Sequence, residues 1–111
     1  MINITICDDD KHFLKLLKQK ITSYLANNNQ LSYTIKCFNS IETLLEYNIS
    51  KVNILFLDVR FKAMSGIDAA KILRELSSYF ILIFVSSYIE YAPAGYSVNA
   101  FRYILKEQID I

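Results

Sequence analysis

Short apolar runs rich in β-branched residues alternate along the chain with longer segments whose apolar residues recur at helical spacing. Five such runs predict strands, at residues 2–7, 33–38, 53–59, 79–85 and 101–105. The runs at 53–59 and 79–85 are almost wholly apolar, as is typical of parallel strands that are covered on both faces. This alternation predicts an α/β fold with a mainly parallel sheet and helices on both of its faces.

The segments between the strands carry recognisable helix starts. Asp9 or Asp10 can cap the first helix, Ser40 can cap the second, and Ser65 can cap the third. The apolar residues that we expect to face the sheet are Phe13, Leu14, Leu17, Ile21 and Leu25, then Ile41, Leu44, Leu45 and Tyr47, then Ile67, Ala70, Leu73 and Leu76. A fourth segment, around Tyr88, Tyr91 and Pro93, predicts an irregular helix, because proline fits only a first turn.

Composition limits the classes of function. The 111 residues are 53% hydrophobic, which predicts one folded domain over residues 1–111. Twelve basic residues against eleven acidic ones give no electrostatic reason to expect direct contact with nucleic acid. No apolar run approaches the ~20 residues of a membrane span. Two cysteines, Cys7 and Cys37, are too few for a disulfide scaffold, and we expect reduced thiols in a cytoplasmic protein.

Polar residues follow the predicted strands, where an open α/β sheet binds its ligands. Asp8, Asp9 and Asp10 follow the first strand, and Asp58 lies at the end of the third. Ser86 and Ser87 follow the fourth strand, and Lys106 follows the fifth. Taken singly, each has an ordinary structural explanation, such as a helix cap or a surface charge. Taken together, they predict one site.

Three converging carboxylates need a cation, because two like charges ~4 Å apart repel by about 4 kcal/mol at an effective dielectric constant of 20. A set of oxygen ligands with few protein groups suits Mg²⁺, which often shares its coordination shell with phosphate. Lys106 can balance further negative charge, and the Ser86 hydroxyl can donate to an oxyanion. The pattern indicates a phosphoryl-transfer site with Asp58 as the nucleophile.

The same residues resemble the receiver domain of two-component response regulators. The matching elements are Ile-Cys-Asp-Asp-Asp at 6–10, Phe-Leu-Asp-Val-Arg-Phe-Lys-Ala-Met-Ser-Gly at 56–66, Phe-Val-Ser-Ser at 84–87 and Ala-Phe-Arg-Tyr-Ile-Leu-Lys at 100–106. The stretch Ser-Tyr-Ile-Glu-Tyr-Ala at 87–92, with Gly95-Tyr96 and Ala100-Phe101, is most similar to receivers that precede a LytTR-type DNA-binding domain. The resemblance implies a flavodoxin-like three-layer fold with strand order 2-1-3-4-5, in which the last helix is truncated here.

The resemblance also implies roles at the site. Asp58 would accept a phosphoryl group from a histidine kinase and, together with Asp8, Asp9 and the backbone carbonyl of Arg60, would bind Mg²⁺. Lys106 would pair with the phosphoryl oxygens. The chain would act as a switch rather than an enzyme, since its only chemistry is the transfer to Asp58 and the later hydrolysis.

The implied switch uses two further residues. Ser86 would move to hydrogen-bond the phosphoryl group, and Tyr103 would turn inward behind it. The surface of the fourth helix and fifth strand would then change shape and be read by a homodimer partner or by an output domain outside this chain, one that binds DNA and regulates transcription.

Departures from the family pattern keep alternatives open. Lys62 and Glu107 stand where proline is usual, and without proline a cis bond at Lys106–Glu107 costs ~3 kcal/mol. A degenerate receiver that acts as an unphosphorylated interaction module is therefore one alternative. A Mg²⁺-dependent phosphohydrolase is disfavoured, because Arg60 stands where a second acid is needed. Flavin binding is disfavoured by the acidic triplet after the first strand, which would repel a phosphate.

Overall fold

Five parallel strands form one sheet in the order β2-β1-β3-β4-β5, which confirms the predicted α/β topology. The computed structural model describes residues 1–28 and 30–109. The strands are β1 (Ile2–Cys7), β2 (Tyr33–Phe38), β3 (Ile54–Leu57), β4 (Ile81–Ser86) and β5 (Arg102–Leu105). The helices are α1 (Lys11–Leu25), α2 (Ile41–Glu46), α3 (Gly66–Leu76) and α4 (Ala92–Tyr96), and short 3₁₀ turns span Ile49–Lys51, Ile89–Tyr91 and Lys106–Gln108.

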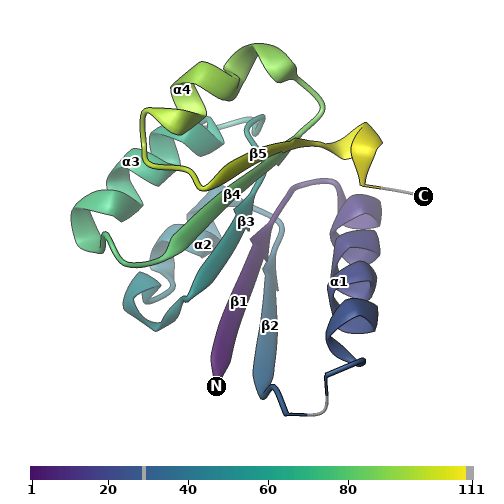
Figure 1. Ribbon diagram of the computed structural model, residues 1–111. Helices are drawn as coiled ribbons and strands as arrows, with labels where there is room; N and C mark the ends of the chain where they lie inside the picture. The colour runs from purple at the N-terminus through teal and green to yellow at the C-terminus, as the bar shows by residue number, and fades with distance from the viewer. Residues whose placement is uncertain (29, 110–111) are drawn as a thin grey trace.

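The sheet separates two apolar layers. In Figure 1, α1 lies on one face of the sheet, and α2, α3 and α4 lie on the other. Alternate residues of β3 point to opposite faces: Leu55 and Leu57 are fully buried in the cluster that α2 and α3 complete, whereas Phe56 packs in the cluster beneath α1. The strand is therefore apolar throughout, as the sequence predicts for a strand with two covered faces.

Each predicted cap is confirmed. Asp10, not Asp9, begins α1: its carboxylate accepts hydrogen bonds from the backbone N–H groups of His12 and Phe13. Ser40 caps α2 and Ser65 caps α3, each through its hydroxyl oxygen. These bonds satisfy N–H groups that the first turn of a helix leaves without partners.

Leu76 contradicts its predicted inward position, because its side chain is 66% exposed. Ile67, Ala70 and Leu73 are buried as expected. Leu76 lies nine residues after Ile67, which at ~3.6 residues per turn is two and a half turns, so the two side chains leave the helix on opposite sides. Residues that recur every three positions fall short of a full helical turn at each step, so after three steps Leu76 no longer lies on the buried face of the helix.

Three predicted strands are shorter than their apolar runs. β3 omits Asn53 and the last two residues of its run. β4 begins at Ile81 rather than Tyr79, whose side chain is 93% exposed, and Ile81 itself is 45% exposed, so the start of this strand is not doubly buried. β5 begins after Phe101, which is also exposed. Sheet pairing, which side-chain type does not reveal, sets these limits.

The last described element is the 3₁₀ turn at Lys106–Gln108, and no cis peptide bond occurs among the described residues. An open groove of about 330 Å³ lies beside α1. Its lining is nearly all apolar and consists of Ile4, Ile21, Tyr24, Leu25, Ile54 and Phe56 together with Lys20. Among the described residues, no helix is both long and apolar enough to cross a membrane.

Candidate phosphoacceptor site

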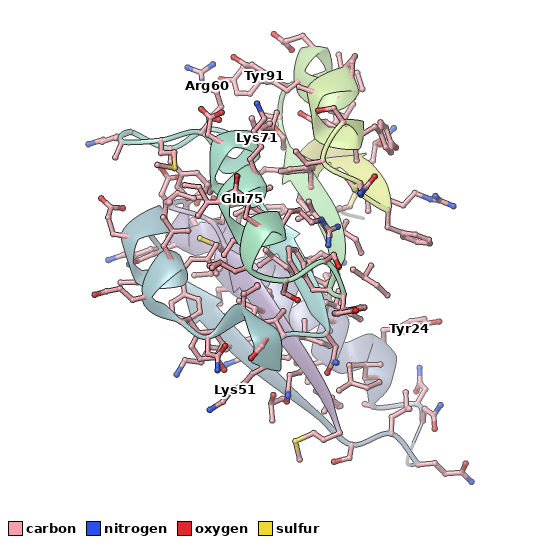
Figure 2. All side chains as sticks on the ribbon, turned by 90° about the vertical axis from the view of Figure 1, so that its left-hand side faces the viewer. Tyr24, Lys51, Arg60, Lys71, Glu75 and Tyr91 are labelled. Atoms are coloured by element: carbon pink, nitrogen blue, oxygen red, sulfur yellow. The ribbon has the colours of Figure 1, made fainter. Side chains whose placement is uncertain are left out.

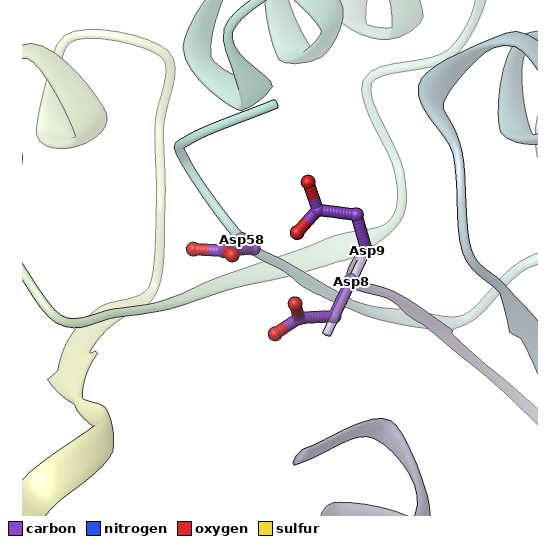
Figure 3. Close-up of side chains that lie close together, drawn as sticks. All are labelled: Asp8, Asp9 and Asp58. Carbon is purple, nitrogen blue, oxygen red and sulfur yellow. The ribbon is translucent and has the colours of Figure 1, made fainter. Parts of the chain in front are cut away.

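The carboxyl ends of β1 and β3 bring three aspartates together. The two strands pair in parallel, with Cys7 opposite Leu57, so the residues that follow them emerge side by side. Asp8, Asp9 and Asp58 each place a carboxylate oxygen within 4.8 Å of the others. Figure 3 shows the three carboxylates around one space. This convergence confirms that the acidic residues form one cluster, as the parallel sheet predicts.

Asp58 is buried and held in a fixed orientation. Its Oδ1 accepts a hydrogen bond from the Val59 backbone N–H at 2.7 Å, and its Oδ2 lies 3.3 Å from Lys106 Nζ. Gly66 makes the tight loop after Asp58 feasible, because a Cβ on Gly66 would lie 1.8 Å from the Asp58 carbonyl oxygen. The start of α3 therefore lies directly against the backbone of the candidate nucleophile.

Lys106 reaches the acidic cluster from the end of β5. Its Nζ lies 2.8 Å from Asp8 Oδ2, and the side chain is only 15% exposed. Burial opposes the charge on this ammonium, but the hydrogen bond to Asp8 and the charges of Asp58 and Asp8 outweigh it, so the pKa of Lys106 is raised. The ammonium therefore stays protonated as a fixed positive charge beside Asp58.

Asp8 is the most buried member of the cluster. Burial raises the pKa of its carboxyl from 3.8 to about 6, and the nearby Asp58 charge adds to this shift. The hydrogen bonds from Lys106 and from the Asp10 backbone N–H, the latter at 2.9 Å, act in the opposite direction. Two hydrogen-bond donors thus do not compensate fully for the loss of water around this carboxylate.

These residues fit a divalent cation. Three carboxylates within 4.8 Å repel one another, and one ammonium beside two of them leaves a net negative site. The donors are all oxygen atoms, and Asp9 is exposed, so water can complete a coordination shell on that side. Mg²⁺ prefers such a site, with few carboxylates and several waters.

Ser86 and Tyr103 lie on the neighbouring strands. Ser86 is fully buried at the end of β4, and its Oγ accepts a hydrogen bond from the Tyr88 backbone N–H at 3.1 Å. The Tyr103 ring packs 6.0 Å from the Phe84 ring, centroid to centroid, and its hydroxyl donates to the Tyr88 carbonyl. Burial is the main reason that the pKa of Tyr103 is raised, so this hydroxyl remains a donor. The loop after β4 is thus bonded to both side chains.

The Arg60 side chain contacts the loop that follows β4. Figure 2 shows its side chain at the end of the molecule that carries Tyr91 and far from Lys51. Its guanidinium lies 4.7 Å from the centroid of the Tyr88 ring, a cation–π contact between the loops that follow β3 and β4. The side chain therefore bridges two loops around the site, and only its backbone carbonyl is a candidate ligand.

Arg74 is an important residue that the sequence does not single out. From the last turn of α3, its guanidinium donates to the carbonyl oxygens of Phe80, Asn99 and Val98 at 2.7–3.0 Å and stacks 4.1 Å from the Phe80 ring. It therefore ties the start of β4 to the loop before β5. The only sequence signal for Arg74 is that it is a basic residue in the last turn of a helix. Because such residues are common, this signal does not single out Arg74.

Comparison with known proteins agrees with the geometry. The family model of the response regulator receiver domain matches residues 4–110. The sensory transduction protein LytT of Enterococcus faecalis is 29% identical over 105 residues, which are 95% of this chain and 42% of LytT. The transcriptional regulatory protein BtsR of Escherichia coli is 26% identical over 96% of this chain and 42% of BtsR. The chain thus spans less than half the length of these relatives.

The fold comparison gives the same result. The crystal structure of the response regulator TrrA of Thermotoga maritima, in complex with Mg²⁺ and BeF, superposes with a TM-score of 0.81 at 21% sequence identity. The match covers 98% of this chain and 90% of TrrA. With a family match over nearly the whole length and the parallel sheet in the order 2-1-3-4-5, this chain belongs to the receiver domains of response regulators.

Proposed function

We propose that Asp58 accepts a phosphoryl group from the phosphohistidine of a sensor histidine kinase and that this reaction requires Mg²⁺. One observation carries the proposal: the buried Asp58 carboxylate has an ammonium 3.3 Å from one oxygen and two further carboxylates within 4.8 Å. A carboxylate nucleophile, a cation site and a fixed positive charge are the parts that phosphoryl transfer needs. The receiver thus acts as a switch and not as an enzyme with a separate substrate.

Asp8, Asp9, Asp58 and the backbone carbonyl of Arg60 would hold the Mg²⁺. When bound, the ion would neutralise charge on the phosphoryl oxygens. The fit rests on the all-oxygen donor set and on the mutual repulsion of the three carboxylates without a cation.

The transfer itself uses this chain's own groups. An Asp58 oxygen forms a bond to phosphorus as the phosphorus–nitrogen bond of the donor breaks, and the leaving imidazole keeps the electron pair. Lys106 pairs with a phosphoryl oxygen, and the Ser86 hydroxyl donates to another. Water later attacks the same phosphorus, which releases inorganic phosphate and restores the Asp58 carboxylate.

Phosphorylation would change the shape of the surface formed by α4 and β5, and a partner would recognise that change. Ser86 and Tyr103 are both linked to the backbone of Tyr88, so movement of Ser86 toward the phosphoryl group would shift the loop that leads to α4. The exposed side chains Ile89, Tyr96 and Phe101 lie on or beside this surface. It would bind a second copy of the receiver or an attached output domain.

The output is proposed to be a DNA-binding domain that regulates transcription. The similarity to LytT and BtsR supports this, since both relatives continue well beyond the matched segment. The receiver, residues 1–111, carries a formal charge of only +1, so DNA contact is assigned to the output domain. We place the protein in the cytoplasm.

The test is incubation with Mg²⁺ and a small acyl phosphate, followed by intact mass measurement. The expected result is one added phosphoryl group that depends on Mg²⁺ and is absent in Asp58→Asn. Asp68→Asn is the matched control, because Asp68 is an exposed carboxylate on α3 outside the cluster. If neither a small phosphodonor nor a kinase labels the wild-type chain, the alternative of an unphosphorylated interaction module replaces this proposal.

A further inference from the structure

The Lys106 ammonium has a third neighbour besides the two carboxylates. Its Nζ lies 4.6 Å from the centroid of the Phe13 ring, in addition to 2.8 Å from Asp8 and 3.3 Å from Asp58. The negative face of an aromatic ring attracts a cation at this distance, most strongly where water is excluded. The Lys106 side chain is 15% exposed and Phe13 is 9% exposed, so the contact is largely shielded from solvent.

The ring is held in place by the start of α1. The Phe13 backbone N–H donates to the Asp10 carboxylate at 3.2 Å, and the Asp10 backbone N–H donates to Asp8. The side chain packs in the apolar cluster with Ile6 and Val85. The acidic triplet therefore sets the first turn of α1, and that turn sets the position of the ring.

The three contacts of the ammonium differ in what happens to them during phosphoryl transfer. Asp8 and Asp58 are the proposed ligands of the divalent ion, and Asp58 also becomes the phosphoryl acceptor. Both carboxylates would then share their negative charge with another cation or lose it. Among these three neighbours, which lie within the described residues, the Phe13 ring is the one that is neither a proposed metal ligand nor the phosphoryl acceptor, so its attraction for Nζ does not depend on either event.

We propose that Phe13 is a positioning residue that keeps the Lys106 ammonium at the site when Asp8 and Asp58 bind the metal ion and Asp58 accepts the phosphoryl group. This inference rests on the proposed function. Phe13 itself touches neither the phosphoryl group nor the metal. It acts through Lys106, because it limits how far the flexible lysine side chain moves when Asp8 and Asp58 interact with the metal ion and the phosphoryl group instead of with the ammonium.

The test compares aromatic and aliphatic replacements at one position. Phe13→Leu and Phe13→Met keep an apolar side chain but remove the aromatic ring, whereas Phe13→Tyr keeps the ring. The expected rate of labelling of Asp58 by a small acyl phosphate in Mg²⁺ falls about 3- to 10-fold in Phe13→Leu and Phe13→Met, as expected for loss of a partly desolvated cation–π contact. Phe13→Tyr is expected to label at close to the wild-type rate.

A spectroscopic signature and a packing control separate positioning from general stability. Because Lys106 Nζ lies over the Phe13 ring, the ring current is expected to shift the ε-methylene resonances of Lys106 upfield in NMR spectra. This shift is expected to vanish in Phe13→Leu and to persist in Phe13→Tyr. Leu17→Val trims a buried residue one turn later in the same cluster. It is expected to lower the free energy of unfolding while leaving the labelling rate and the Lys106 resonances unchanged.

The outcomes distinguish this inference from the function on which it rests. If the wild-type chain is not labelled at all, the proposed function fails and the positioning role falls with it. If the wild-type chain is labelled but Phe13→Leu labels at the same rate, or Leu17→Val slows labelling as much, only the positioning role is overturned. Slow labelling in Phe13→Tyr as well as in Phe13→Leu would also overturn it.

Discussion

At the scale of single residues, the balance of charge around Asp8 decides how the acidic cluster behaves without a metal ion. Asp8 is nearly fully buried and shares one ammonium with Asp58. Burial is the largest cause of its raised pKa of about 6, compared with 3.8 for an ordinary carboxyl. The free energy of unfolding should therefore depend on pH in a predictable direction.

Asp8→Asn is expected to stabilise the metal-free protein at neutral pH. Ionising a carboxyl with a raised pKa costs the folded state free energy, and this cost grows as the pH rises from 3.8 to 6 and is complete above 6. In EDTA at pH 7.5 the variant should gain about 1–3 kcal/mol over the wild type in urea unfolding, with a smaller gain at pH 5. Mg²⁺ should stabilise the wild type but not the variant.

Asp9→Asn serves as the control for that measurement, since Asp9 is an exposed member of the same cluster. It should lose Mg²⁺ stabilisation without a comparable gain in EDTA. An Asp8→Asn variant that is less stable than the wild type at pH 7.5 in EDTA would contradict this account of the cluster.

At the scale of secondary-structure elements, Arg74 joins parts of the chain that the sheet alone does not connect. Its guanidinium donates to four carbonyl oxygens: those of Ser78 and Phe80 before β4, and those of Val98 and Asn99 before β5. Asn99 has a positive φ of 60°, which is uncommon for a residue other than glycine. The arginine thus fixes a loop whose backbone conformation is not favourable by itself.

Arg74→Lys is expected to lower the free energy of unfolding by about 2 kcal/mol, because an ammonium cannot reproduce the planar fork of donors. Amide hydrogen exchange over residues 97–101 should become faster, while exchange in β1 should change little. Arg102→Lys is the control, since Arg102 is exposed and its described contacts lie at the adjacent Phe101. Equal effects of the two substitutions would show that Arg74 has no special role.

At the scale of the whole molecule, the sequence predicts the sheet and the meeting of Asp8, Asp9, Asp58 and Lys106, because the carboxyl ends of parallel strands share one edge. It does not predict contacts between side chains from distant elements, such as Lys106 with Phe13 or Arg74 with Asn99. It also fails at element ends: Leu76 rotates out of the core, and Tyr79 lies before the first paired residue of its strand.

The apolar groove beside α1 is expected to make the 111-residue chain associate with itself. Ile21, Leu25 and Phe56 are among the residues that line it, and Tyr24 at its rim is 79% exposed. Open apolar surface of this kind favours association. Tyr24→Lys should reduce the association seen by sedimentation equilibrium without lowering stability. Tyr79→Lys, which changes an even more exposed tyrosine, should have no effect; an equal reduction in both variants would assign the association to general hydrophobicity.

The most direct test of the central proposal is to locate the phosphoryl group. The chain is incubated with Mg²⁺ and a small acyl phosphate as the phosphodonor. The aspartyl phosphate that forms on the protein is then trapped by reduction with borohydride, and the modified residue is identified by peptide mass spectrometry. The proposal predicts that modification occurs at Asp58 alone and disappears when EDTA replaces Mg²⁺. Modification at Asp8, at Asp9 or at a residue outside the acidic cluster, or labelling that persists in EDTA, would contradict it.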